Sequence, residues 1–430
     1  MFIKKHQYTL VFSVLIAISI VLAALITFGG PRVSRTILYE SLDNQRFVIT
    51  FNSPIENISS PISIHPEIPF ETRISGRQIT ISFREPLAYA TTYELSLSVT
   101  DDRTKSSNVT TSFDTRNPDM FYMKRSATGN DTIYQTKLND IRSEVVVFSH
   151  PRILEFTVGE STLLVLTETN ETRKLHLINR SEKEITLPND DTIVGVDGTP
   201  QNNTFLITLQ DQKFQLHSWL YISENDSWTE VVQDIGGSLT SSQASFTPDG
   251  ETITYFDQNQ ALILDDPTDD RDGVSLGIFD AKRRFLPNMS GIFGSRSNQY
   301  VTISAEEGVE TPAPEPIQTS FLPFVFNNQQ DYVYIQQSFD SLTEQLTQNI
   351  RTLINDTVTD IAAYSTDERL VLGMSISPND EFFMTEEALQ PVIYDNAPLN
   401  NKPQNVITRI RSTQSGDIIR QLDGFDIIFR

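Results

Sequence analysis

Two kinds of apolar pattern divide the chain. The first is a run of twenty uncharged residues, Thr9 to Phe28, which Gly29-Gly30-Pro31 follows. Apolar helices of this length span a bilayer core of about 30 Å. After this run, short segments alternate apolar and polar residues, the pattern of half-buried strands. The sequence therefore predicts a transmembrane helix over 9–28, followed by a mainly β region.

A cleaved signal peptide is the alternative interpretation of the apolar run. Signal peptides have apolar stretches of about 7–15 residues and a small-x-small cleavage site, and this run is longer and lacks such a site. We therefore expect an uncleaved single-pass signal anchor. It comprises a cytoplasmic tail (1–8), the span (9–28) and a linker (29–35), and it holds the large C-terminal part outside the cytoplasm at the plasma membrane.

Residues 36–117 have the pattern of a small antiparallel sandwich. Residues 46–51, 78–83, 93–99 and 109–113 are short alternating runs, with turn-forming residues between them. Strands at this spacing are typical of β-sandwiches. We expect one sandwich of about 80 residues, in line with the usual size of such domains.

The same segment resembles the Ig-like domain of bacterial surface-layer proteins. The resemblance rests on Val48-Ile-Thr-Phe51-Asn-Ser-Pro54-Ile55, on Ile79 to Phe83, on Leu87 to Tyr93 with Asp101, and on Ser112-Phe113-Asp-Thr115. The family has a glycine turn where this chain has Asp-Arg-Thr-Lys after Asp101. The resemblance implies a spacer or adhesive module without catalytic residues.

The remaining residues, 118–430, repeat a strand–turn–strand unit about every 45 residues, a period typical of β-propellers. The clearest copies are Ala244–Tyr255 and Met374–Met384, and the weaker ones centre on residues 157, 200, 296 and 328. The last strand, 425–429, is expected to pair with three early strands (120–124, 132–138 and 144–148). Such pairing gives about seven four-stranded blades, with six as the alternative.

The turn Phe246-Thr-Pro248-Asp249-Gly250 resembles the TolB-type, WD40-like propeller repeat. Proline restricts φ and Asp-Gly favours a tight hairpin turn. The resemblance implies a propeller over 118–430 but names no ligand, because propellers host many functions.

Three segments interrupt the repeat. The spacing of Leu342, Leu346, Ile350 and Leu353 predicts a helix near 341–354, and Thr311–Pro316 is predicted to be a polar, proline-stiffened loop. In the acidic run 265–273, Asp270 and Asp272 are weak candidate calcium ligands. The bidentate glutamate of a calcium loop is replaced by Phe279, so a solvated acidic hairpin is the simpler interpretation.

Charge and composition narrow the functional classes. The chain carries 33 Lys+Arg against 56 Asp+Glu, a net charge of −23, and it contains no cysteine. The negative charge argues against nucleic-acid binding because nucleic-acid backbones are also negative. The absence of cysteine excludes disulfides, thiolate metal sites and cysteine nucleophiles.

No catalytic motif of the common hydrolase, metalloprotease or nucleotide-binding classes occurs. His176 and His217 occupy similar places in predicted strands and are interpreted as ordinary propeller residues. We expect a non-catalytic surface protein whose sandwich presents an acidic propeller to a protein or glycan partner, without a cofactor. The alternatives are an anchored envelope hydrolase acting on glycans or peptides, and a TolB-like component of an envelope complex.

Overall fold

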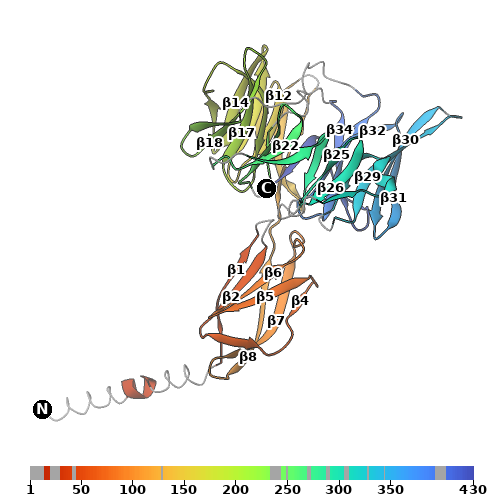
Figure 1. The fold of residues 1–430 in the computed structure, drawn as a ribbon. Helices are drawn as coiled ribbons and strands as arrows, with labels where there is room; N and C mark the ends of the chain where they lie inside the picture. The colour runs from red at the N-terminus through yellow and green to blue at the C-terminus, as the bar shows by residue number, and fades with distance from the viewer. Residues whose placement is uncertain are drawn as a thin grey trace, which may run out of the picture. The chain divides into compact units, whose positions relative to one another are not determined.

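Strands make up nearly all of the regular structure in the computed structural model (Figure 1). The structure describes residues 14–19, 30–40, 45–126, 129–232, 244–247, 250–268, 273–286, 291–304, 309–326, 329–342, 344–392 and 403–430. The chain divides into two compact units. The described residues up to Thr115, without Ala88–Ala90, form the first unit, and Arg116–Arg430 with Ala88–Ala90 belong to the second.

The predicted transmembrane helix needs correction. Within 9–28 the structure describes residues 14–19, which are helical, while the rest of the predicted span and the predicted cytoplasmic tail (1–8) lie outside the described residues. In the part of the chain that is described, no helix is both long and apolar enough to cross a membrane. The prediction relied on the length of an apolar run, which records hydrophobicity and does not establish a continuous helix.

The first unit contains two four-stranded antiparallel sheets. One sheet has the order β1 (Val33–Tyr39), β2 (Arg46–Phe51), β6 (Gln78–Phe83), β5 (Phe70–Ser75). The other is built on β7 (Thr92–Asp101), which pairs with β3 (Ile55–Ile58), β4 (Ser63–His65) and β8 (Ser106–Asp114). Alternate residues of β2, β6 and β7 enter one core, which includes Phe47, Ile79 and Leu95. Membership of the Ig-like family stays a prediction.

Asp101 explains how the β7–β8 hairpin turns without glycine. Its buried carboxylate accepts the backbone N–H groups of Arg103 and Lys105 at 3.0 and 2.8 Å. Thr104 takes the left-handed conformation that glycine usually supplies, with φ of 60°. An aspartate that bonds the backbone of its own turn stabilises this conformation.

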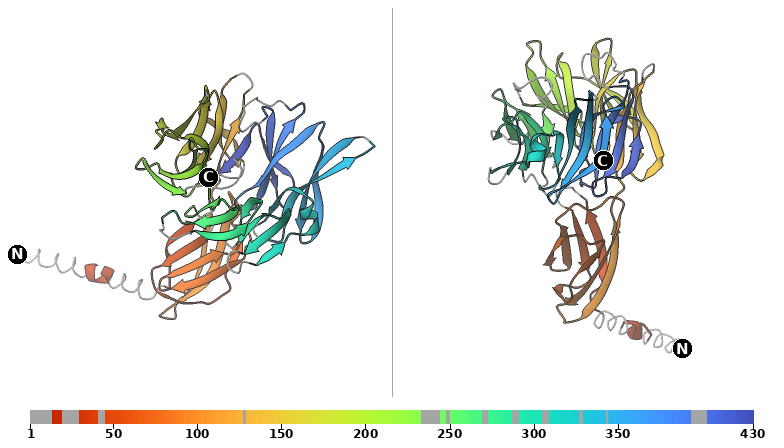
Figure 2. Two further views of the ribbon diagram at one scale, coloured as in Figure 1. Left: turned by 45° about the horizontal axis from the view of Figure 1, so that its top comes forward. Right: turned by 90° about the vertical axis from the view of Figure 1, so that its right-hand side faces the viewer.

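The second unit contains seven four-stranded antiparallel sheets among its described residues, and in the left view of Figure 2 they fan around the C-terminus. Sheet 1 consists of β36 (Phe425–Phe429), β9 (Asp119–Lys124), β10 (Asp131–Lys137) and β11 (Asp140–His150). Sheets 2 and 3 consist of β12 (Ile153–Val158), β13 (Leu163–Thr169), β14 (Thr172–Asn179), β15 (Ser181–Ile185), and of β16 (Thr192–Gly198), β17 (Thr204–Gln210), β18 (Leu216–Ile222), β19 (Ser227–Val232).

The other four sheets follow in chain order. Sheet 4 consists of β20 (Ser245–Phe246), β21 (Ile253–Phe256), β22 (Ala261–Asp265), β23 (Val274–Ile278), and sheet 5 of β24 (Ala281–Phe285), β25 (Gly291–Arg296), β26 (Gln299–Ser304), β27 (Glu310–Pro312). Sheet 6 consists of β28 (Phe321–Val325), β29 (Tyr332–Asp340), β30 (Gln345–Ile354), β31 (Thr357–Ser365), and sheet 7 of β32 (Arg369–Ile376), β33 (Phe382–Leu389), β34 (Val406–Ser412), β35 (Ile418–Leu422).

The closing strand pairs as predicted. β36 lies antiparallel to β9, with Phe425 opposite Met123 and Phe429 opposite Met120. Sheet 1 therefore combines the last strand of the chain with three early ones, which removes two free sheet edges. This arrangement and the seven sheets define the unit as a β-propeller.

The turns between the first two strands of several sheets share one hydrogen-bond pattern. Thr247 N–H donates to Thr252 O, Phe326 N–H to Asp331 O and Ser377 N–H to Phe382 O. Leu286 N–H donates to Gly291 O with the same spacing, so the equivalent turn of sheet 5 follows Leu286. The repeat copy centred on Arg296 therefore lies one strand too late in sheet 5. Its turn joins β25 to β26, the second and third strands, whose apolar and polar residues alternate as regularly as those of the first two strands of other sheets.

Neighbouring sheets are joined by carboxylates as well as by apolar packing. Glu155 on β12 accepts the backbone N–H of Val196 on β16, and Asp197 on β16 accepts that of Phe246 on β20. Buried backbone donors need such acceptors. The acidic residues of the first strands thus help to set the spacing of the sheets.

Two further local predictions are wrong. Residues 345–354 are strand β30, not a helix, and Gln348, Ile350 and Thr352 enter the core with period two. The Pro-rich tract is also not a free loop, because it contributes β27 and the short helix α2 (Glu315–Gln318), whose Ile317 is fully buried. In both segments contacts between sheets outweigh the local pattern.

Candidate functional site

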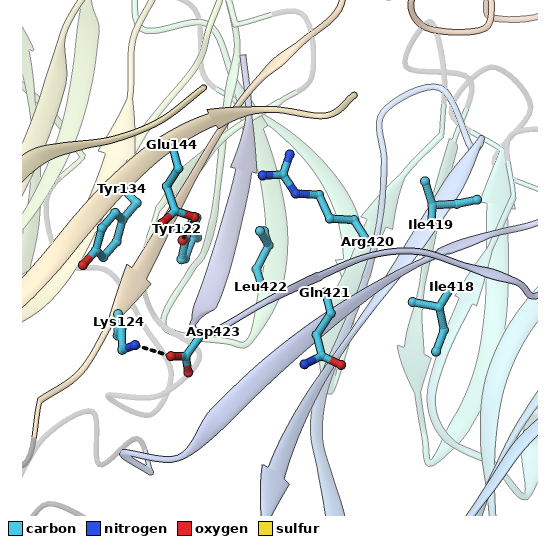
Figure 3. A pocket seen from close by; sticks show the side chains of 10 residues that line it. All are labelled: Tyr122, Lys124, Tyr134, Glu144, Ile418, Ile419, Arg420, Gln421, Leu422 and Asp423. Carbon is cyan, nitrogen blue, oxygen red and sulfur yellow. Dashed lines mark hydrogen bonds and ion pairs between the residues drawn. The ribbon is translucent and has the colours of Figure 1, made fainter. Parts of the chain in front are cut away.

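A pocket of about 460 Å³ lies where sheet 1 meets sheet 7 (Figure 3). We call it the closure cleft, because the ring closes at these two sheets. Its lining comes from both ends of the propeller sequence: Tyr122, Lys124, Tyr134, Glu144, Ile418, Ile419, Arg420, Gln421, Leu422 and Asp423. Its volume suits a large side chain or a small ligand.

Strand register brings the two tyrosines together. Tyr134 on β10 lies opposite Tyr122 on β9, and the two rings stack with their centroids 5.3 Å apart. Tyr134 also lies opposite Val146 on β11. Side chains that are directly opposite in a sheet share a face, so Val146 lies on the same face of sheet 1 as the two tyrosines, and the tyrosines line the cleft.

Glu144 receives a hydrogen bond from the Tyr122 hydroxyl. Burial raises the pKa of Tyr122, and the neighbouring carboxylate raises this pKa further because it disfavours a second negative charge. Tyr122 therefore stays protonated and donates. Glu144 keeps one carboxylate oxygen, Oε1, for which the described residues supply no hydrogen bond.

Arg420 on β35 is a buried arginine whose donors point toward sheet 1. Its guanidinium donates to the carbonyls of Lys137 and Leu138 and, at 2.7 Å, to Thr136 Oγ1. Burial lowers the pKa of Arg420 because the charged form loses hydration. Arg420 therefore links sheet 7 to sheet 1 through several bonds that are already committed.

Lys124 and Asp423 form an ion pair at the mouth of the cleft (Figure 3). The hydrogen bond with Asp423 raises the pKa of Lys124. Both side chains are about half exposed or more, and such pairs contribute little to stability. The pair is therefore available for exchange with an incoming charged group.

Exposed apolar side chains flank the closure cleft on both sheets. Ile418 and Ile419 on β35 line the cleft and are 48 % and 47 % exposed. On β11, Val146 lies opposite Tyr134 on the same face of sheet 1 and is 60 % exposed. β11 and β35 are the outermost strands of their sheets in the described chain. Clusters of exposed apolar residues mark interaction sites more often than isolated ones do.

The predicted calcium ligands cannot be placed, because Asp270 and Asp272 lie outside the described residues. Phe279, which replaces the bidentate glutamate, is buried in the core between sheets 4 and 5. Within the described ranges no group of three His, Asp or Glu side chains could hold a metal ion. The calcium proposal stays a prediction.

The structure places His176 and His217 on the equivalent third strands of sheets 2 and 3. His176 bonds Thr167 through Nε2 and Glu182 through Nδ1, at 3.0 and 2.9 Å. The Nδ1 of His217 lies 3.2 Å from Glu230. Each histidine therefore has partners in its own sheet, and the two belong to different sheets.

Sequence reasoning missed the closure cleft. Its residues come from strands almost three hundred positions apart, such as Tyr122 and Arg420. A usable signal was the predicted pairing of 425–429 with 120–124, because it placed residues 418–423 beside the early strands. Nothing in the local pattern singled out Glu144 or Asp423.

The fold defines the second unit as a β-propeller with seven sheets in the described residues. Known structures with a similar fold include TolB from Acinetobacter baumannii (12 % identity, TM-score 0.36, covering 85 % of this chain and 81 % of that one). A candidate 6-phosphogluconolactonase from Bacteroides uniformis has 11 % identity and a TM-score of 0.43, and covers 73 % and 99 %. An uncharacterized protein from Listeria monocytogenes EGD-e has 10 % identity and a TM-score of 0.42, and covers 72 % and 92 %.

No protein-family model matches the chain, and no curated protein sequence matches it. The structural similarities are at low identity and with TM-scores below 0.5, and no property of this chain is taken from them. The functional argument rests on the residues of the closure cleft.

Proposed function

We propose that this protein binds a partner protein through the closure cleft and catalyses no reaction. The observation that carries the proposal is that a pocket lies beside the outermost strand β35 and is lined by two exposed aliphatic side chains of that strand, Ile418 and Ile419. Interfaces combine such an apolar centre with a polar rim. The rim here consists of Glu144, Gln421 and the Lys124–Asp423 pair.

The composition of the cleft supports binding over hydrolysis. The Tyr122 hydroxyl occupies one oxygen of Glu144, and Lys124 pairs with Asp423. A hydrolase would instead need a nucleophile beside a base, or two carboxylates free to act on one bond, and here Glu144 and Asp423 are each engaged by a neighbouring side chain. A glycan ligand remains the alternative outcome of the experiment below.

The extracytoplasmic location expected from the sequence is also part of this proposal. The lack of cysteine and the strong negative charge support this location. Protease treatment of intact cells tests it, because degradation of the propeller is expected and its full protection would contradict an outside location.

The binding proposal is tested with the full-length protein immobilised and exposed to cell extract and to a glycan array. A double variant, Ile418→Asp with Ile419→Asp, places charge on the cleft wall. Val274→Asp with Ile278→Asp is the matched control, because it changes two exposed residues on β23, the outermost strand of sheet 4.

We expect the wild type and the control variant to retain one protein from the extract, and the cleft variant to lose it. With the purified partner, the cleft variant should bind more weakly than the wild type and the control. Thermal unfolding checks that all three proteins fold. Equal retention by the cleft variant, or binding to glycans alone, would contradict a protein site at the cleft. Turnover of a glycan or peptide by the wild type would contradict the non-catalytic proposal.

A further inference from the structure

We propose that the closure cleft binds an extended polypeptide segment, which pairs with the edge of β35 and places one arginine or lysine side chain between Glu144 and Asp423. This inference rests on the proposed function and specifies the ligand of the same site. It assigns the segment's backbone to the strand edge and its basic side chain to the pocket.

The edge of β35 is the natural position for a segment of this kind. All five residues of β35 line the pocket, and among the described strands β35 pairs with β34 alone. The outer edge of a terminal strand presents N–H and C=O groups that can pair with an added strand. Ile418 and Ile419 supply apolar contacts for alternate side chains of such a strand.

The unused hydrogen-bonding capacity of the cleft favours a donor-rich guest. Arg420 directs its N–H groups to sheet 1, and Lys124 is paired with Asp423. The second oxygens of Glu144 and Asp423 have no bond from the described residues and can still accept. Arginine and lysine carry several donors and no acceptor, so they complement these oxygens.

The apolar walls suit the rest of such a side chain. Arginine and lysine have long aliphatic stems that pack on apolar surface while the charged end stays polar. Tyr134 is half-buried in the cleft and offers an aromatic ring, and the face of an aromatic ring attracts a cation. An acidic guest would have to compete for Lys124 and Arg420, which already donate to Asp423 and to sheet 1, whereas Glu144 and Asp423 each keep an oxygen that the described residues do not bond.

The net charge of the whole chain also favours a basic segment over an acidic one. A net charge of −23 creates a negative potential that raises the association rate of basic partners. This effect is screened by salt, so binding of a basic segment should weaken as the ionic strength rises. A purely apolar segment would bind with little dependence on salt.

The experiment uses the full-length protein to select from a phage-displayed library of short random peptides. We expect enriched peptides that alternate apolar residues and carry one arginine or lysine at a constant position. Replacing that basic residue by glutamine should weaken binding at least about tenfold, a difference typical of one charge-assisted contact.

Isosteric variants locate the basic side chain. Glu144→Gln with Asp423→Asn should weaken the basic peptide about tenfold and leave its glutamine version unchanged. Asp360→Asn with Glu310→Gln is the matched control, because both carboxylates belong to exposed ion pairs on sheets 6 and 5. The control removes the same charge and should bind like the wild type.

Three results would overturn the inference: enriched peptides without a basic residue, equal weakening by the control variant, or no enrichment. The first leaves the proposed function intact, provided that Ile418→Asp with Ile419→Asp abolishes binding of those peptides. If the partner retained from extract also binds the Ile418→Asp with Ile419→Asp variant as tightly as the wild type, the proposed function fails together with the inference.

Discussion

At the scale of single residues, one buried carboxylate organises the contact between sheets 6 and 7. Glu387 is 0 % exposed and accepts bonds from Arg369 and Arg409 at 2.6 and 2.9 Å. The Tyr364 hydroxyl lies 3.3 Å from the same carboxylate and accepts bonds from Arg409 and Arg411. A buried charge of this kind is tolerable only with all of its partners in place.

Removing this carboxylate should be costly. Glu387→Ala is expected to lower the free energy of unfolding by about 3–5 kcal/mol, because it leaves two arginines partly buried without their counter-charge. Urea denaturation measures the change. Glu310→Ala removes an exposed partner of Arg296 and should cost less than about 1 kcal/mol, so similar losses in the two variants would contradict the argument.

The raised pKa of Tyr122 leads to a second prediction for a single residue. Burial and Glu144 raise its pKa in the folded protein above the ordinary value of 10.0. The stabilisation that comes from its protonated form is therefore complete below pH 10 and is lost as the pH rises above that value. Tyr122→Phe should flatten the fall in stability on the alkaline side, measured by thermal unfolding. An unchanged alkaline profile would contradict it.

At the scale of elements, the β29–β30 hairpin shows where local pattern reasoning fails. Leu342, Leu346, Ile350 and Leu353 have helical spacing, yet Leu342 lies at a turn and is 93 % exposed. The strand pattern was hidden because two of its buried positions are polar, Gln348 and Thr352. Gln348 is satisfied only in the folded unit, where it exchanges two bonds with the backbone of Val371.

Substitutions at Ile350 and Leu342 distinguish a strand from a helix at residues 345–354. Ile350→Ala should lower the free energy of unfolding by about 2–5 kcal/mol, because Ile350 is fully buried between sheets. Leu342→Gln should change it by less than about 0.5 kcal/mol. Chemical denaturation distinguishes the strand from the helix, since an amphipathic helix would require Leu342 to be buried and its replacement to be costly.

At the scale of the whole propeller, closure depends on a single short strand. β36 supplies the strand of sheet 1 beside β9, and Phe425 is buried there in a cluster with Phe121, Met123 and Val406. Closing a ring with the last strand joins distant parts of the chain, and loss of β36 leaves the edge of β9 without its partner strand.

A chain that ends at Asp423 should therefore lose cooperative unfolding of the second unit. We expect a lower and broader thermal transition, and faster amide exchange in β9 and β10 than in β17, because β9 would lose its partner strand. Hydrogen exchange with mass spectrometry makes the comparison. Unchanged protection of β9 in the shortened chain would show that β36 is dispensable for closure.

Alternation and turn residues predicted many of the strands, with β30 and β27 as exceptions, and they predicted the pairing of 425–429 with the early strands. These features are local in the sequence, and closure follows from three early strands that lack a fourth. The position of the first turn of sheet 5 after Leu286, the burial of Gln348 and the position of the closure cleft became clear from the tertiary structure. Their outcome depends on contacts between residues such as Tyr122 and Arg420, which the ring brings together from opposite ends of the propeller.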